Sequence, residues 1–153
     1  MKIANICHSR VPKFVIGNDN PKPKSEAVSK RMQRVRTKDT GVERRVKGIL
    51  RRESLQFRGN HSALPGSPDL VLTKHNIAIF VDGCFWHGCP RCYKPPKNNR
   101  AWWEAKISAN RRRDRRVTRA LRAQGYSVLH LWEHNNDHRM TKLIRGAVKR
   151  AKN

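Results

Sequence analysis

The chain has 153 residues, with 35 Lys+Arg against 11 Asp+Glu and a formal net charge of +24. That length fits one domain with one hydrophobic core, and the 37% of apolar residues is low but above the composition of a fully disordered chain. No stretch approaches the ~20 apolar residues of a membrane span, and no signal-peptide segment is seen, so we expect neither a secreted nor an integral-membrane protein. The excess of cations predicts a polyanion partner, with nucleic acid as the first candidate.

Helices are predicted in the first third of the chain, after a basic arm. Residues 1–24 have no sustained hydrophobic period and end in a Pro/Lys stretch, which is typical of a flexible arm. A helix is predicted from Ser25 to about Arg36. A second helix begins at Thr40, because Thr40 and Glu43 have the spacing of a capping box. Its apolar face has helical spacing and consists of Val42, Val46, Ile49 and Leu50.

Three short strands follow, at residues 56–58, 69–72 and 76–81. The third is an unbroken apolar run, as expected for a strand that is covered on both faces. The connection Lys74-His75-Asn76 is short enough to join the second and third strands as a hairpin.

The second half of the chain begins with a loop at residues 82–99, which contains three cysteines and three prolines. A long helix is predicted from about Arg100 to Gln124, where Gly125 stops it. A strand at 126–132 and a helix at 138–152 complete the chain. The order of elements predicts an α/β fold with a mixed central sheet flanked by helices.

Acidic residues are few, so each one inside a motif is informative. A carboxylate in such a positive field ionises easily and attracts a divalent cation. Asp69 follows the sequence LPGSP and opens a strand, which a turn joins to a second apolar strand. This is the ground plan of the restriction-endonuclease-like nuclease core, although a Pro-Asp dipeptide before a strand is more often only turn chemistry.

The long helix places two polar residues, Asn110 and Asp114, on its apolar stripe. Such residues are either satisfied within the core, for Asp114 by Arg113 or Arg115, or they point into a site. The other faces of this helix are rich in arginine and almost free of acids, which favours contact with phosphates. These arginines are Arg111, Arg112, Arg115, Arg116, Arg119 and Arg122.

Cys84, Cys89 and Cys92 have C-x4-C-x2-C spacing, one ligand short of a tetrahedral zinc site. Zinc is favoured over buried free thiols. His87 and His134 are the leading candidates for the fourth ligand, ahead of His130 and His138.

An aromatic pair, Phe85-Trp86, lies beside these cysteines in a loop bounded by glycines. It is either a small satellite core over the zinc or a wedge that inserts between bases.

The run DGCFWHGCP at 82–90 resembles the signature of the very-short-patch repair (Vsr) mismatch endonucleases. The match begins with SKRM at 29–32, continues through LPGSPD and ends at Trp132-Glu133, over roughly residues 25–135. The resemblance implies that residues 25–153 form a restriction-endonuclease-like domain with a structural zinc site. It also implies an enzyme that nicks one DNA strand beside a T:G mismatch left by deamination of 5-methylcytosine.

The same resemblance implies the context in which the protein works. Its partner would be double-stranded DNA with a T:G mismatch, with a functional link to a cytosine-5 DNA methyltransferase and no membrane partner. We expect a monomer that acts in the cytoplasm, at the bacterial nucleoid.

The resemblance further implies roles for individual residues. Asp69 would bind the catalytic Mg²⁺ together with the carbonyl of Val81, and His87 would be the general base. Glu43 and Asp114 match acids that hold metal-bound waters or orient His87.

Asp82 is included among the catalytic acids without a defined role. The E-x-K motif of the wider nuclease superfamily is absent from residues 79–82, which is consistent with His87 replacing its lysine.

Three apolar residues match side chains that intercalate into DNA. Phe85 and Trp86 would enter from one groove and Met32 from the other. His134 falls where the family places its last zinc ligand, which leaves His87 out of the metal site. The implied zinc ligands are Cys84, Cys89, Cys92 and His134.

An alternative of another class is a non-catalytic zinc-containing protein that binds DNA or RNA. It would use the same basic surface and thiols, but it would not require Asp69, His87 and Asp114 to converge in space.

Overall fold

The computed structural model describes residue 26 and residues 40–152. The predicted N-terminal arm, nearly all of the predicted helix from Ser25 to Arg36, and Met32 lie outside these residues. The elements after Thr40 follow in the order α2 (Gly41–Arg52), β1 (Arg58–Gly59), β2 (Leu70–Leu72), η1 (Thr73–His75), β3 (Ile77–Asp82), α3 (Arg100–Ala123), β4 (Ser127–Trp132) and α4 (Asp137–Ala151).

The elements predicted from Thr40 onward are confirmed, with shifts at their ends. The strand predicted at 56–58 is the largest discrepancy, because the observed strand holds only Arg58 and Gly59. Its extent is set by its pairing with Val71 and Leu70 across the sheet, which no local pattern encodes.

The capping box at the start of α2 is present. Thr40 Oγ1 accepts a hydrogen bond from the Glu43 N–H at 3.2 Å, and Glu43 Oε1 accepts one from the Thr40 N–H at 3.4 Å. These contacts satisfy two of the N–H groups that a helix start leaves unpaired. They also fix Glu43 in a buried position, with 5% of its surface exposed.

The four strands form one mixed sheet in the order β1-β2-β3-β4. The first two pairs are antiparallel, and β2 and β3 form the predicted hairpin through η1 and Asn76, whose φ is +49°. β3 and β4 are parallel, and the crossover between them consists of a loop and α3. Their register sets Phe80 opposite His130 and Asp82 opposite Trp132.

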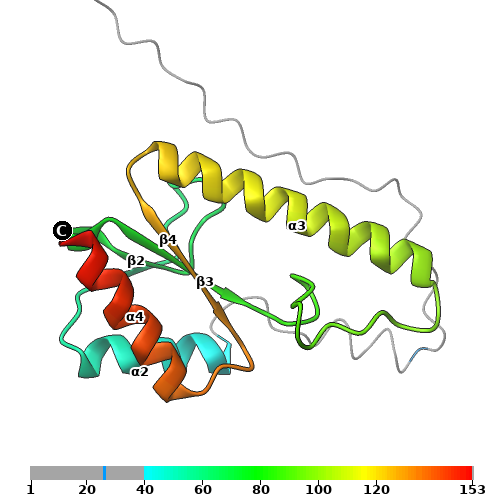
Figure 1. Cartoon of the computed structure of the whole chain (residues 1–153), viewed down its shortest axis with the longest axis horizontal. Helices are drawn as coiled ribbons and strands as arrows, with labels where there is room; N and C mark the ends of the chain where they lie inside the picture. The colour runs from blue at the N-terminus through cyan, green and yellow to red at the C-terminus, as the bar shows by residue number, and fades with distance from the viewer. Residues whose placement is uncertain (1–25, 27–39, 153) are drawn as a thin grey trace, which may run out of the picture.

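Helices cover the sheet on both faces, as the unbroken apolar run of β3 predicts. α2 and α4 lie on one side of the sheet and α3 on the other (Figure 1). The larger core joins Val46 and Ile49 of α2 and Ile144 of α4 to the sheet, and the smaller one joins Val117 and Leu121 of α3 to it. No helix in the described part of the chain is long and apolar enough to span a membrane.

The N-terminal half of α3 extends past the strands, and the loop between β3 and α3 runs alongside it (Figure 1). We call this segment, residues 83–99, the cysteine loop. Asn110 Nδ2 donates to the Trp86 carbonyl at 2.9 Å, and Arg111 donates to the Gly88 carbonyl. The helix therefore holds the loop through backbone carbonyls, and this contact positions the residues of the site.

Candidate functional site

Asp69 and Val81 lie side by side because β2 and β3 are antiparallel neighbours. The start of β2 is then next to the end of β3, with Leu70 opposite Ile79. The Val81 N–H donates to Asp69 Oδ2 at 2.7 Å. The two residues predicted to share a magnesium ion therefore meet at one edge of the sheet.

Asp69 lies in a negative local environment. Burial raises the pKa of Asp69, and the charges of Glu43 and Asp82 raise it further, against the opposing effects of the Val81 N–H and of His87. Carboxylate oxygens are the ligands that divalent cations such as Mg²⁺ prefer. A cation beside Asp69 would relieve the repulsion among these acids, so the donor set fits such an ion.

His87 faces two carboxylates from different elements. Its Nδ1 lies 2.8 Å from Asp114 Oδ2 and 3.7 Å from Asp82 Oδ1. Because an ionised carboxylate only accepts hydrogen bonds, Nδ1 carries the proton, and Nε2 is left without one in the neutral ring. Burial lowers the pKa of His87, but the Asp114 hydrogen bond and the two negative charges outweigh it, so the pKa is raised.

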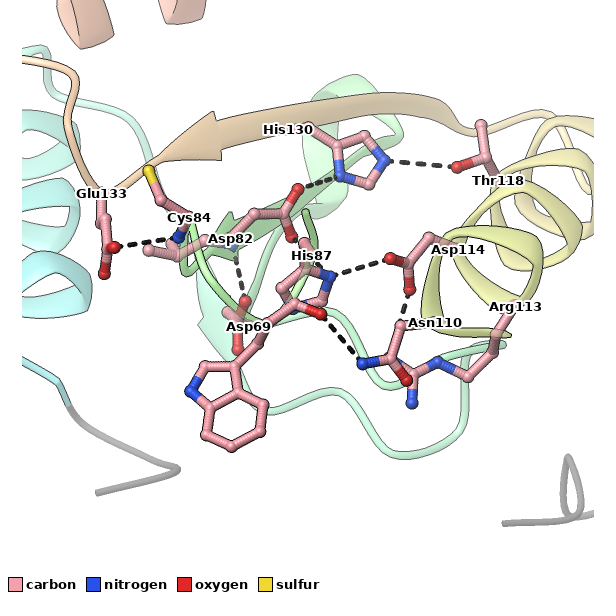
Figure 2. A network of polar contacts seen from close by, with 12 residues as sticks. Asp69, Asp82, Cys84, His87, Asn110, Arg113, Asp114, Thr118, His130 and Glu133 are labelled. Carbon is pink, nitrogen blue, oxygen red and sulfur yellow. Dashed lines mark hydrogen bonds and ion pairs between the residues drawn. The ribbon is translucent and has the colours of Figure 1, made fainter. Parts of the chain in front are cut away.

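Both polar residues on the apolar stripe of α3 point toward the cysteine loop (Figure 2). Asn110 holds the backbone of Trp86, and Asp114 holds the His87 ring. Asp114 also accepts a hydrogen bond from Arg113 at 3.2 Å. Both alternatives for Asp114, pairing with an arginine and pointing into a site, are therefore observed. Burial raises the pKa of Asp114, but His87 and Arg113 outweigh it and lower the pKa overall.

Asp82 has a partner that sequence reasoning missed. Its carboxylate is buried, and its Oδ2 accepts from His130 Nδ1 at 2.6 Å. His130 Nε2 lies 3.3 Å from Thr118 Oγ1 (Figure 2). The His130 ring stacks on that of Phe80. The signal that could have found it is the alternation of β4, which places His130 on the sheet face that α3 covers.

The predicted catalytic residues therefore converge from separate parts of the chain. Asp69 precedes β2, Asp82 ends β3, His87 belongs to the cysteine loop and Asp114 to α3. Asp69, Asp82 and Asp114 lie around His87 (Figure 2), and His87 and Asp82 act electrostatically on Asp69. Asp69, His87 and Asp114 therefore converge in space, which a non-catalytic binding protein would not require.

The four implied zinc ligands form one cluster, in which all four ligand atoms lie within 4.8 Å of one another. Nδ1 of His134 lies 3.0 Å from the sulfur of Cys84, 3.7 Å from that of Cys89 and 3.4 Å from that of Cys92. Three sulfurs and one imidazole at such spacing fit a structural zinc site. His87, His130 and His138 are not part of this cluster.

The thiols of Cys84 and Cys89 differ in the direction in which their surroundings shift their pKa. Burial raises the pKa of Cys84 to about 12, whereas hydrogen bonds from the Arg91 and Cys92 backbone help to lower that of Cys89 against burial. A bound zinc ion would keep its cysteine ligands deprotonated, because its charge offsets the cost of burying thiolates close together.

Phe85 and Trp86 belong to an aromatic cluster beside the zinc ligands. The ring centroid of Phe85 lies 5.2 Å from that of Trp86, 5.1 Å from Trp103 and 5.8 Å from Tyr93. The pair thus packs as the satellite core that the sequence allowed. Both side chains are only half-buried, however, so they also present apolar surface next to His87.

Comparisons with known proteins agree on one family. The family model described as DNA mismatch endonuclease Vsr matches residues 22–94. The chain is 42% identical over 104 residues to the type II nicking enzyme V.XorIIP of Xanthomonas oryzae pv. oryzae, over 67% of this chain and 76% of the relative. It is 40% identical over 107 residues to the DNA mismatch endonuclease Vsr of Escherichia coli, which covers 69% of this chain and 68% of the relative. It is also 34% identical over 119 residues to the type II nicking enzyme V.NaeI of Lentzea aerocolonigenes, which covers 74% of this chain and 72% of the relative.

Loss of a zinc ligand should unfold the cysteine loop. We expect about one zinc ion per chain by metal analysis, with Cys89→Ser and His134→Ala losing the ion and several kcal/mol of unfolding free energy. Cys7→Ser, which removes a thiol outside the C-x4-C-x2-C motif, is the control and keeps its zinc. Loss of zinc at unchanged unfolding free energy would contradict a structural role.

Gly88 should not tolerate a side chain. Its φ is +60°, and an added Cβ would lie 2.5 Å from Ile107 Cγ2 and 2.6 Å from Arg111 Nε. Gly125 is the matched control, since its φ is +83° but an added Cβ would meet nothing within 4 Å. We expect Gly125→Ala to cost about 1–2 kcal/mol from backbone strain, and Gly88→Ala about 1–3 kcal/mol more from overpacking. Equal costs in urea unfolding would refute the close contact.

His130 and Asp82 should be energetically coupled. His130→Ala leaves the buried Asp82 carboxylate without its shortest hydrogen bond, at an expected cost of about 1.5–3 kcal/mol of unfolding free energy. In an Asp82→Asn background the same substitution should cost clearly less, as a double-mutant cycle will measure. Thr118→Val, which removes only the longer contact to Nε2, serves as the milder comparison. Equal costs of His130→Ala in the two backgrounds would show that the pair is not coupled.

Proposed function

The chain belongs to the Vsr family of DNA mismatch endonucleases, and on that basis we propose that it uses Mg²⁺ to nick one strand of duplex DNA beside a T:G mismatch. Its fold is restriction-endonuclease-like, and its activity is that of an endodeoxyribonuclease that nicks mismatched DNA. The observation that carries the proposal is the convergence of Asp69, His87 and Asp114 around one space. The non-catalytic alternative is disfavoured by this convergence and by the family.

His87 is the proposed general base. Asp114 holds the ring through Nδ1 at 2.8 Å, so the unprotonated Nε2 can accept a proton from the attacking water. The Asp114 carboxylate then stabilises the imidazolium that forms. Asp82, at 3.7 Å from the same nitrogen, adds a second negative charge to this effect.

Asp69 and the carbonyl of Val81 are the proposed ligands of Mg²⁺, and Glu43 is proposed to hold waters around it. When bound, the ion neutralises charge that develops on the phosphate and on the leaving oxygen. The residues themselves supply a preformed site. The Val81 N–H donates to one carboxylate oxygen of Asp69 at 2.7 Å and leaves the other oxygen to coordinate the ion.

Mismatch recognition is assigned to the aromatic pair Phe85-Trp86. A mismatched step is cheaper to open than a paired one, so a wedge of large apolar side chains favours it. The pair directly precedes His87, and Trp103 supports both rings from α3, with centroids 5.1 and 5.9 Å away. Entry of Met32 from the other groove remains a prediction, because Met32 lies outside the described residues.

The cellular role follows from the proposed substrate. A T:G mismatch arises when 5-methylcytosine is deaminated, so the enzyme would work alongside a cytosine-5 DNA methyltransferase in very-short-patch repair. Action as a monomer on the DNA of the bacterial nucleoid, in the cytoplasm, is part of this proposal.

A labelled duplex with one T:G mismatch tests the proposal. The native chain should nick one strand when Mg²⁺ is added and should leave a matched T:A duplex intact. Asp69→Ala should slow nicking at least about 10²-fold, and His87→Ala about 10²–10⁴-fold. Glu104→Gln is a control, because Glu104 is exposed on α3 and pairs only with Arg100 among the described residues.

Two outcomes would contradict this assignment. Nicking that survives Asp69→Ala would remove the proposed metal ligand from the mechanism. Equal nicking of the matched duplex would remove mismatch specificity while leaving a DNA endonuclease.

A further inference from the structure

A pocket of about 650 Å³ opens beside the proposed catalytic residues, between α3 and β4. One end of it is lined by Asp82, His87 and Asp114. From there it follows α3, and its lining along that helix is basic. The pocket therefore opens onto Asp82, His87 and Asp114, and arginines of α3 line much of the rest of it.

The basic lining consists of arginines at regular helical spacing, namely Arg111, Arg115, Arg119 and Arg122. Residues at i, i+4, i+8 and i+11 share one face of a helix. They span about 16 Å at 1.5 Å per residue, which corresponds to several nucleotides of a DNA strand at ~3.4 Å per phosphate along the axis. Arg112 and Arg116, on other faces of α3, do not line the pocket.

The charge of this face is not neutralised within the described residues. Arg111 donates to the Gly88 carbonyl, but Arg115, Arg119 and Arg122 have no acidic partner in that part of the chain. The nearby acids are engaged elsewhere, because Asp82 pairs with His130, and Asp114 pairs with His87 and Arg113. Three guanidinium groups are thus left to face an anionic ligand.

The opposite wall suits a ligand with apolar as well as charged parts. It consists of Trp132 and His130 of β4 and Pro90 of the cysteine loop. A phosphodiester chain presents anionic phosphates and less polar sugar faces in alternation, whereas an isolated inorganic anion would make no use of the apolar wall. Arginines in a row next to a backbone-cutting centre match such a chain.

We propose that this groove binds the phosphodiester backbone of the strand that is cut, on one side of the scissile phosphate. Arg115, Arg119 and Arg122 contact successive phosphates, and the strand enters the reaction centre at His87 and Asp114. The assignment to the cut strand rests on the proposed function, because the groove opens directly onto the proposed catalytic residues. It also separates six of the eight arginines of α3 into three that contact this strand, Arg111, which anchors the cysteine loop, and Arg112 and Arg116, which lie outside the groove.

Salt-dependent binding tests the groove independently of cleavage. The dissociation constant of a T:G duplex is measured without added Mg²⁺ over a range of salt concentrations. Each phosphate contact contributes about 0.9 to the slope of log K against log[salt], so Arg115→Gln/Arg119→Gln should lower the slope by about 1.8. The matched variant Arg112→Gln/Arg116→Gln removes the same charge from the same helix and should change the slope clearly less. Equal changes in the two double variants would overturn the groove and leave only a general electrostatic effect.

Neutral methylphosphonates at single positions then identify the strand. On one side of the nick, in the cut strand, they should weaken binding of the native chain but not of Arg115→Gln/Arg119→Gln, which has already lost those contacts. Sensitivity confined to the uncut strand, or identical in the native chain and the variant, would overturn the proposal. If the native chain does not nick the T:G duplex, the proposed function fails instead, so the two failures are distinguishable.

Discussion

The hydrogen bond between His87 and Asp114 is the contact on which the site depends. It joins the cysteine loop to α3. The loop directly precedes this helix in the chain, but His87 and Asp114 are 27 residues apart. At 2.8 Å it fixes both the position of the imidazole and the nitrogen that carries its proton. Asn110 and Arg111 reinforce it by binding the carbonyls on either side of His87, so the loop is aligned along the helix at three successive residues.

The acids of the proposed reaction centre lie deeper in the molecule than the arginines of α3. Four of its eleven acids, Glu43, Asp69, Asp82 and Asp114, gather in or around the reaction centre, while arginines occupy the exposed faces of α3. The exposed cations create a long-range field that attracts DNA. The inner acids create a local field that attracts a cation and would repel a phosphate without one. DNA binding and cation binding at the proposed reaction centre therefore depend on different parts of the protein.

Local sequence patterns predicted the helices, the hairpin and the capping box, because these depend on residues close together in the chain. The fold class followed from their order, and the comparisons agree with the resemblance carried by residues 82–90. The choice of His134 over His87 as the fourth metal ligand needed that resemblance, since spacing alone favoured neither. His130 escaped prediction because its pairing with Asp82 depends on the parallel register of β3 and β4, which brings together residues 48 positions apart. Asn110 was located on the correct stripe, but its role required the position of the cysteine loop.

The zinc cluster has a consequence for the life of the protein before it meets DNA. Cys84 and Cys89 enclose Phe85, Trp86 and His87 in the sequence, and His134 attaches that short segment to the end of β4. An ion bound by these four residues would therefore restrain the segment that carries the proposed base and wedge. A newly synthesised chain that has not acquired its metal would lack this restraint on both. Metal loading would then precede full nuclease activity, because the proposed base would be held by all its contacts only in the loaded chain.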